Sequence, residues 1–234
     1  MALNKQDALK QKAAHRAVEA IESGMIVGLG TGSTTSFAVM RIAERIKSGD
    51  LANIVGIPTS IRTETLAREL GIPLATLDEQ PEIDVTIDGA DEVDPELNLI
   101  KGGGGALLRE KVVAQASRRN IIIVDESKLS DCLGTHWALP VEVIPFAART
   151  ETDFMQSLGA AVSMRRDNQG QPYKTDQHNC ILDANFGPMS DPTALANRLN
   201  ERAGIIEHGL FLGLASEVIV AAKDGIQHLE RKDK

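Results

Sequence analysis

The chain has 234 residues, and its 42% hydrophobic content is enough to bury a substantial core in one large or two modest domains. Lysine and arginine total 25 against 33 acidic residues, and the resulting net charge of −8 argues against nucleic-acid binding through a basic surface. Residues 1–12 are polar and lack the apolar core of a signal peptide, and no stretch approaches the roughly 18 apolar residues of a membrane span. We therefore expect a cytoplasmic protein with neither nucleic-acid nor membrane partners.

The cysteines and histidines do not form a metal-binding pattern. Cys132 and Cys180 lie far apart without a Cys-x-x-Cys spacing, so we expect reduced thiols that pack as small hydrophobic side chains. The histidines lack ligand spacing, and His178 near Cys180 is the only suggestive pair. The sequence therefore predicts no metal site.

The first half of the chain alternates helical and strand patterns. Helices are expected over 4–23, through the apolar positions at 39–46, and over 61–70 and 107–117. Strands are expected at 25–29, 54–57, 72–77, 83–87 and 121–124. The last strand is wholly apolar, as in parallel sheets that are buried on both faces. This order predicts an α/β fold with a doubly wound, mostly parallel, Rossmann-like sheet.

The pattern changes after Gly134. Expected strands at 141–144, 160–164, 180–184 and 205–212 combine with helices at 151–158 and 191–202 into a β-α-β-β-α-β unit. That order is typical of a ferredoxin-like α+β domain, and the strand 218–222 then returns to the first sheet. We expect a Rossmann-like catalytic domain over 1–134 and 212–234 and a ferredoxin-like domain over 135–211. The charged tail from Glu230 is expected to fray.

Several polar segments directly follow expected strands. These segments are 30–34, Thr59-Ser60, 88–91 and 125–128. Ligands of open parallel sheets sit outside the carboxyl ends of the strands, so we expect these segments to converge on one edge.

The loop Gly30-Thr31-Gly32-Ser33-Thr34 opens a helix, where free amides and hydroxyls can hold an anion. It lacks the Gly-Lys-Ser/Thr ending of a Walker A loop and the third glycine of a dinucleotide fingerprint. The loop therefore predicts a monophosphate site. The alternative is a tight strand-to-helix turn with Ser33 as the cap.

The turn Asp88-Gly89-Ala90-Asp91 brings two carboxylates three residues apart. Mutual repulsion would raise one apparent pKa and let the pair handle protons. The alternative is that the aspartates only cap the backbone of the turn.

Lys101 precedes four glycines, a run suited to close approach of backbone to ligand. A lysine there can stabilise an oxygen on which negative charge develops, whereas the alternative is a flexible surface loop. Glu110 lies in the charged run Arg109-Glu110-Lys111, which in isolation indicates the solvated face of a helix.

The order and spacing of these four motifs resemble the type A family of ribose 5-phosphate isomerases. The likeness covers most of the chain and is weakest in the expected ferredoxin-like domain. It implies reversible conversion of ribose 5-phosphate to ribulose 5-phosphate through a cis-enediol, in the non-oxidative pentose phosphate pathway. It also implies a small-molecule sugar-phosphate partner, no metal or organic cofactor, and a homodimer or homotetramer.

Carried over by motif, the resemblance places the proton-transfer base at Glu110. Lys101 would stabilise the reacting oxygen, and Asp88 and Asp91 would serve ring opening and hydroxyl contacts. The implied substrate-binding residues are Thr31, Gly32, Ser33, Thr34, Asp88, Gly89, Ala90, Asp91, Lys101, Gly102, Gly103, Gly104 and Lys128.

Two other classes compete with an isomerase. A sugar-phosphate-sensing regulator can share the fold, but no helix-turn-helix pattern precedes the expected sheet. A nucleotide-dependent oxidoreductase is disfavoured by the glycine loop.

Overall fold

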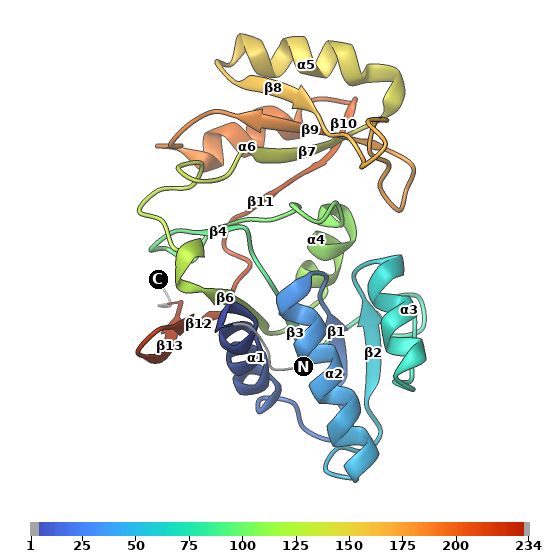
Figure 1. Ribbon diagram of the computed structural model, residues 1–234. Coiled ribbons are helices and arrows are strands. Elements are labelled where there is room, and N and C mark those ends of the chain that lie inside the picture. The colour runs from blue at the N-terminus through green and yellow to red at the C-terminus, as the bar shows by residue number, and fades with distance from the viewer. Residues whose placement is uncertain (1–4, 232–234) are drawn as a thin grey trace. The chain divides into compact units, whose positions relative to one another are not determined.

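A computed structural model describes residues 5–231 (Figure 1). The chain forms two compact units, each assembled from separate stretches of sequence. The first contains the residues up to Ala90, Arg109–Lys128 and those from Gly213 onward. The second contains Asp91–Leu108 and Leu129–Leu212. No helix in the described range 5–231 combines the length and apolar character needed to cross a membrane.

The first unit is built on a six-stranded sheet. In sheet order its strands are β13 (Gly225–Glu230), β12 (Glu217–Ala222), β6 (Asn120–Asp125), β3 (Val85–Asp88), β1 (Ile26–Leu29) and β2 (Val55–Pro58). All neighbours are parallel except the β12–β13 hairpin. The expected α/β fold with a mostly parallel sheet is confirmed.

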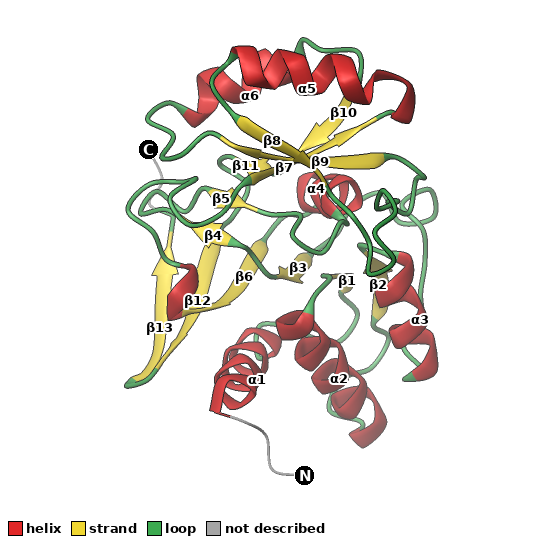
Figure 2. Ribbon diagram, turned by 45° about the horizontal axis from the view of Figure 1, so that its top comes forward, coloured by secondary structure: helices red, strands yellow, loops and turns green. Residues whose placement is uncertain are grey.

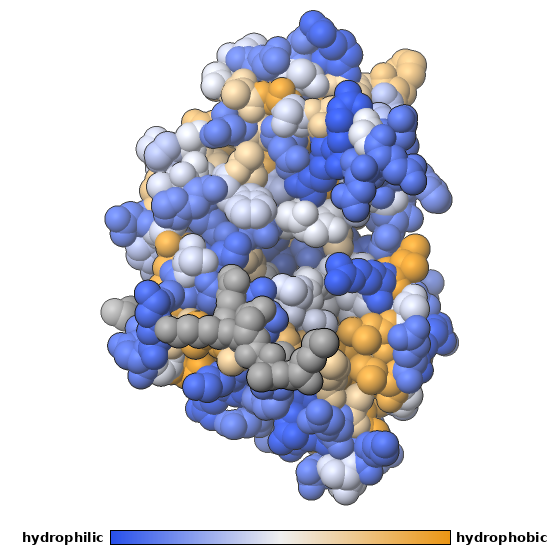
Figure 3. Space-filling view, viewed as in Figure 1, coloured by the Kyte–Doolittle hydropathy of each residue, from blue (hydrophilic) through white to orange (hydrophobic). Residues whose placement is uncertain are grey.

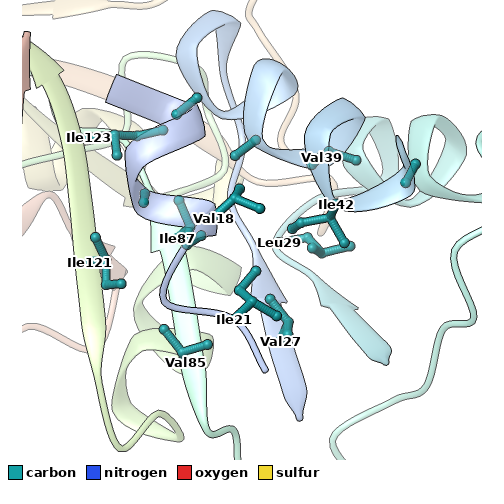
Figure 4. Close-up of a cluster of buried hydrophobic side chains, with 14 of the residues drawn as sticks. Val18, Ile21, Val27, Leu29, Val39, Ile42, Val85, Ile87, Ile121 and Ile123 are labelled. Carbon is teal, nitrogen blue, oxygen red and sulfur yellow. The ribbon is translucent and has the colours of Figure 1, made fainter. Parts of the chain in front are cut away.

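Helices cover both faces of this sheet (Figure 2). They are α1 (Lys5–Val18), α2 (Ser33–Ser48), α3 (Ile61–Glu69) and α4 (Leu107–Gln115). Because successive strand residues point to opposite faces, Val27 and Leu29 enter the cluster beneath α1 and α2 shown in Figure 4. Gly28, between them, faces Val113 of α4, and a Cβ at Gly28 would lie only 2.9 Å from that side chain.

The second unit contains a four-stranded antiparallel sheet. Its order is β10 (Ile205–His208), β7 (Leu139–Val143), β9 (Cys180–Asn185) and β8 (Ala161–Met164). The helices α5 (Ala148–Ser157) and α6 (Pro192–Asn200) lie on one face (Figure 2). α6 begins as expected, because the Asp191 carboxylate accepts a hydrogen bond of 2.9 Å from the Ala194 amide. The strand order is that of the expected ferredoxin-like unit.

The second unit also contains a small three-stranded sheet that the sequence did not indicate. Its strands are β11 (Leu210–Phe211), β5 (Leu99–Ile100) and β4 (Glu92–Val93), two residues each. The expected strand 205–212 is therefore divided between two sheets, with Gly209 at the division. The predicted domain limits of 1–134 with 212–234, and of 135–211, differ from the observed units mainly at 91–108. That segment belongs to the second unit, where β5 pairs with both β4 and β11.

Two other local expectations were wrong. The predicted strand 72–77 forms only a single bridge between Leu74 and Gly56. The bridge is made by the Gly56 amide, which donates to the Pro73 carbonyl, and by the Ala75 amide, which donates to the Gly56 carbonyl. Pro73 itself lacks an N–H group and cannot donate a further bond. The tail was expected to fray from Glu230, but that residue ends β13, opposite Glu217. Residues 232–234 lie outside the described range.

Candidate active site

In the first unit, the parallel strands β1, β2, β3 and β6 end at one edge of the sheet. The segments that follow them are residues 30–34, Thr59-Ser60, Asp88-Gly89 and the short 3-10 helix η1 (Glu126–Lys128). The expected convergence at the carboxyl edge is therefore found for these four segments.

The glycine loop ends in a helix N-terminus without a side-chain cap. Gly32 is the N-cap of α2, with φ of 134°, a conformation that favours glycine. Ser33 is the first helical residue, so the alternative in which Ser33 is the cap is wrong. The first-turn amides of Ser33, Thr34 and Thr35 have no intrahelical acceptor, and they meet the positive end of the helix dipole. This geometry suits a phosphate group.

Lys10 of α1 adds a positive charge to this loop. Its Nζ atom donates a hydrogen bond of 3.1 Å to the Ser33 Oγ. The sequence gives no indication of this role for Lys10, because a lysine in a polar helix far upstream carries no local signal. The spatial link between α1 and the start of α2 identifies it.

The Thr31 hydroxyl belongs to a hydroxyl cluster rather than facing outward. Its Oγ1 lies 2.8 Å from Thr59 Oγ1, 2.7 Å from Ser60 Oγ and 3.0 Å from Thr63 Oγ1. A hydroxyl has one proton and two lone pairs, so these three partners occupy its capacity. The cluster fixes the loop against the start of α3, and phosphate binding by the Thr31 hydroxyl stays a prediction.

Asp88 at the end of β3 anchors the same loop. Its Oδ1 accepts hydrogen bonds from the amides of Gly89, at 2.8 Å, and Thr31, at 3.2 Å. A Cβ at Gly30 would lie 2.3 Å from that oxygen, which requires glycine at position 30. Asp88 is buried, and the backbone-capping alternative holds for its Oδ1 atom.

Asp91 falls in the second unit, whereas Asp88 falls in the first. The Asp91 Oδ2 accepts a 2.7 Å hydrogen bond from the Gly103 amide. A Cβ at Gly103 would lie 2.6 Å from the Asp91 Oδ1, so the carboxylate and the glycine-rich segment are in direct contact. The shared handling of a proton by the two aspartates stays a prediction.

Lys101 and the glycines after it form a packed turn of the second unit. Lys101 is only 3% exposed, and its Nζ lies 5.4 Å from the centroid of the Phe211 ring. Its amide donates to the Gly209 carbonyl at 2.9 Å, and the Gly105 amide donates to the Gly102 carbonyl at the same distance. These bonds and the burial of Lys101 contradict the surface-loop alternative.

Glu110 lies in the first turn of α4 and is only 4% exposed. The interpretation of this residue as part of a solvated helix face was therefore wrong. A carboxylate in the first turn is favoured by the helix dipole. Lys111 beside it is also buried, so a charged triplet typical of a surface helix is in fact mostly enclosed.

Lys128 ends η1, after β6. The turn before it is held by Asp125, whose Oδ1 accepts hydrogen bonds from the amide and hydroxyl of Ser127. Because β3 lies between β6 and β1, Lys128 and the glycine loop follow strands two positions apart at the same edge.

No group of three or more histidine, cysteine, aspartate or glutamate side chains within residues 5–231 has the arrangement of a metal site. Cys132 and Cys180 are both free thiols. His178 lies in a tight turn, where its amide donates to the Thr175 carbonyl at 2.8 Å.

Similar proteins of known identity show which family the chain belongs to. A family model described as ribose 5-phosphate isomerase A (phosphoriboisomerase A) matches residues 55–225. The chain belongs to the ribose 5-phosphate isomerase A family. A ribose-5-phosphate isomerase A from Desulfatibacillum aliphaticivorans is 62% identical over 228 residues, covering 97% of this chain and 99% of the relative. One from Chloroflexus aurantiacus is 58% identical over 224 residues, covering 96% of this chain and 94% of the relative.

Solved structures of the family have the same fold. Ribose 5-phosphate isomerase from Plasmodium falciparum superposes with a TM-score of 0.94 at 42% identity, covering 97% of this chain and 100% of that one. A D-ribose-5-phosphate isomerase in complex with phospho-erythronic acid has a TM-score of 0.95 at 42% identity, covering 98% of this chain and 100% of that one.

Proposed function

We propose that this protein interconverts ribose 5-phosphate and ribulose 5-phosphate through a cis-enediolate, with Glu110 as the base. The reaction belongs to the non-oxidative pentose phosphate pathway. The observation that carries the proposal is the burial of Glu110 at the start of α4, in a chain that matches this family over most of its length. A carboxylate removed from water at the start of a helix is suited to proton transfer.

The phosphate group is assigned to the start of α2. The first-turn amides, the Ser33 and Thr34 hydroxyls and the Lys10 ammonium supply donors and positive charge there. Lys128 supplies a further charge from the same edge of the sheet. A phosphate dianion gains most where helix amides and ammonium groups meet it together, so these groups account for recognition of a phosphorylated sugar.

The chemistry requires one base to move a proton between adjacent carbons. In the forward direction, Glu110 removes the proton from carbon 2 of the open-chain aldose, and the electron pair moves toward the carbonyl oxygen at carbon 1. The same carboxyl group then returns the proton to carbon 1, while the proton of the carbon 2 hydroxyl passes to the oxygen on carbon 1, which leaves a hydroxyl at carbon 1 and the ketone at carbon 2. No electrons are exchanged with an external group.

The developing negative charge on oxygen needs donors at fixed positions. We assign this part to Lys101 and the segment Gly102-Gly103-Gly104, whose backbone is held in a turn. Asp88 and Asp91, with Gly89 and Ala90, are assigned to ring opening and hydroxyl contacts. Support comes from the phospho-erythronic acid found in the related structure, because its carboxylate carries negative charge on two oxygens as an enediolate does.

A coupled assay that detects ribulose 5-phosphate formed from ribose 5-phosphate tests the proposal. Turnover by the purified protein, inhibited competitively by phospho-erythronic acid, is the expected result. Absence of turnover by folded protein would refute it.

A homodimer or homotetramer and a cytoplasmic location remain our expectations, and light scattering coupled to size exclusion distinguishes the two assemblies. Figure 3 shows hydrophobic residues grouped near α2 and α3. Met40 of α2 and Ile61 of α3 are exposed.

A further inference from the structure

A partly buried arginine of the second unit binds the backbone of the glycine-rich segment. Arg165 directly follows β8, and its Nη1 donates to the Gly102 carbonyl at 2.7 Å and to the Gly103 carbonyl at 3.1 Å. Its side chain is 15% exposed. Nothing in the sequence motifs pointed to Arg165, because it lies more than sixty residues downstream of these glycines.

Asp183 of β9 fixes the guanidinium in place. Arg165 Nε donates to the Asp183 Oδ2 at 3.0 Å, and Nη2 donates to Oδ1 of the same carboxylate. This two-point contact sets the plane of the guanidinium, so the remaining nitrogen can point only at the glycine carbonyls. A lysine at position 165 would keep the charge and lose this geometry.

The carbonyl contacts also determine where the amides of the segment point. In a trans peptide, the C=O and the following N–H point to opposite sides, and the described chain has no cis peptide bonds. The Gly102 carbonyl faces Arg165, and the Gly103 amide correspondingly donates to Asp91. The Gly103 carbonyl also points at Arg165, so the Gly104 amide of the same peptide points away from the guanidinium.

Gly104 is exposed, and its amide makes no hydrogen bond to any residue in the described part of the chain. It is therefore a donor held in a fixed direction and open to a ligand. A cation bound to the carbonyl of the same peptide also polarises that peptide and strengthens its N–H as a donor.

We propose that Arg165 is a positioning residue for the isomerisation. Held by Asp183, it orients and polarises the Gly102–Gly103 and Gly103–Gly104 peptides, so that the Gly104 amide stabilises the enediolate oxygen. This inference rests on the proposed function of the glycine-rich segment. Arg165 itself contacts neither substrate nor reacting atoms in this scheme. Its contribution falls on the transition state, where charge develops, more than on substrate binding.

The test compares Arg165→Met and Arg165→Lys with the control Arg166→Met. Arg166 is the neighbouring exposed residue, whose Nη1 contacts the Gly170 carbonyl instead of the glycine-rich segment. We expect Arg165→Met to lower kcat about tenfold to a hundredfold, less than the roughly 10²–10³-fold of a lost oxyanion donor, with KM changed less than threefold. Arg165→Lys should recover little of this loss, and Arg166→Met should match the wild type.

Inhibitors separate positioning from a general structural defect. Phospho-erythronic acid should bind Arg165→Met more weakly by about the factor lost in kcat/KM, whereas inhibition by inorganic phosphate should stay the same. Added guanidinium ion at millimolar concentration should restore part of the activity of Arg165→Ala, and methylammonium should not. Equal loss of affinity for both inhibitors, or unchanged kcat, would overturn the proposal.

A double-mutant cycle examines the role of Asp183. If Asp183 acts only through Arg165, Asp183→Asn should reduce kcat in the wild type and have no further effect in Arg165→Met. Additive losses would show that the two residues act separately. Each variant is compared with wild-type protein in the same assay. An inactive wild type would refute the proposed function. An active wild type with an equally active Arg165→Met would refute only the role of Arg165.

Discussion

The ammonium of Lys10 and the hydroxyl of Ser33 are joined by a hydrogen bond of 3.1 Å between α1 and the first residue of α2. This contact places a positive charge at a helix N-terminus that already presents free amides. The glycine loop alone is compatible with a simple turn, and the added charge makes this helix start better suited to binding a phosphate group.

Replacing Lys10 with methionine should therefore weaken binding of the phosphate end. We expect KM for ribose 5-phosphate to rise about tenfold or more, because a hydrogen bond to a charged group contributes about 1.5–3 kcal/mol, while kcat changes little. Lys12→Met, at an exposed position of the same helix, is the matched control. Steady-state kinetics measure both, and a Lys10→Met protein with unchanged KM would remove Lys10 from the site.

Unphosphorylated ribose should be a far poorer substrate than ribose 5-phosphate. The first-turn amides of α2 gain their binding energy only from an anion. The check is the ratio of kcat/KM for the two sugars, and similar values would contradict the assignment of this loop.

Glu110→Gln should reduce turnover by about 10²–10⁴-fold, the usual contribution of general acid–base catalysis. The amide keeps the shape of the carboxylate and loses its basicity, so substrate binding and the unfolding transition should be nearly unchanged. Wild-type protein should also exchange carbon-bound substrate hydrogen with deuterated water, followed by NMR, and the variant should not. Near-normal turnover by folded Glu110→Gln would move the base to Asp88 or Asp91.

Activity should survive exhaustive chelation, because Lys101 and backbone amides are assigned the stabilisation that a metal would otherwise supply. The measurement is turnover after dialysis against EDTA. Loss of activity that one divalent ion restores would mean that the aspartates bind metal.

Glu142 of β7 should make the stability of the protein depend on pH. Burial raises the pKa of this carboxyl group, and this effect outweighs the hydrogen bonds donated by Asn179 and Thr175, which lower it. The folded state therefore binds this proton more tightly than the unfolded state, so this contribution to stability is full below the unfolded pKa and is lost as pH rises through the folded pKa.

Glu142→Gln removes this titration. Its free energy of unfolding, relative to wild type, should increase as pH rises from about 4 to 7, an interval chosen from the ordinary pKa of about 4.3 for glutamate. Urea unfolding at several pH values measures the difference. A difference that stays constant across that interval, or that shrinks with rising pH, would contradict the role assigned to burial.

The sequence predicted most of the fold because its strands and helices carry strong local patterns. The wholly apolar stretch around Ile121–Val124 and the Asp191 cap are examples. β13 was missed because five of its six residues are exposed, so it has no apolar alternation to detect. β4, β5 and β11 are only two residues long, too short for any periodicity.

The candidate site was predictable where it lies in contiguous motifs and not where it depends on distant contacts. The glycine loop and the aspartate turn could be found from spacing. Lys10 and Arg165 could not, since each acts on a motif far away in sequence through a single side chain. Glu110 was identified only by resemblance, because a residue between two charged neighbours is not predicted to be buried.

The division of the chain has a consequence for how the protein is made. The polypeptide passes from one unit to the other at four places, after Ala90, Leu108, Lys128 and Leu212. During synthesis, β6 lacks one of its sheet neighbours until β12 emerges near the end of the chain. The Rossmann-like sheet therefore cannot be completed before the whole ferredoxin-like unit has left the ribosome, so one edge of β6, with its apolar residues 121–124, stays unpaired in the nascent chain until β12 is synthesised.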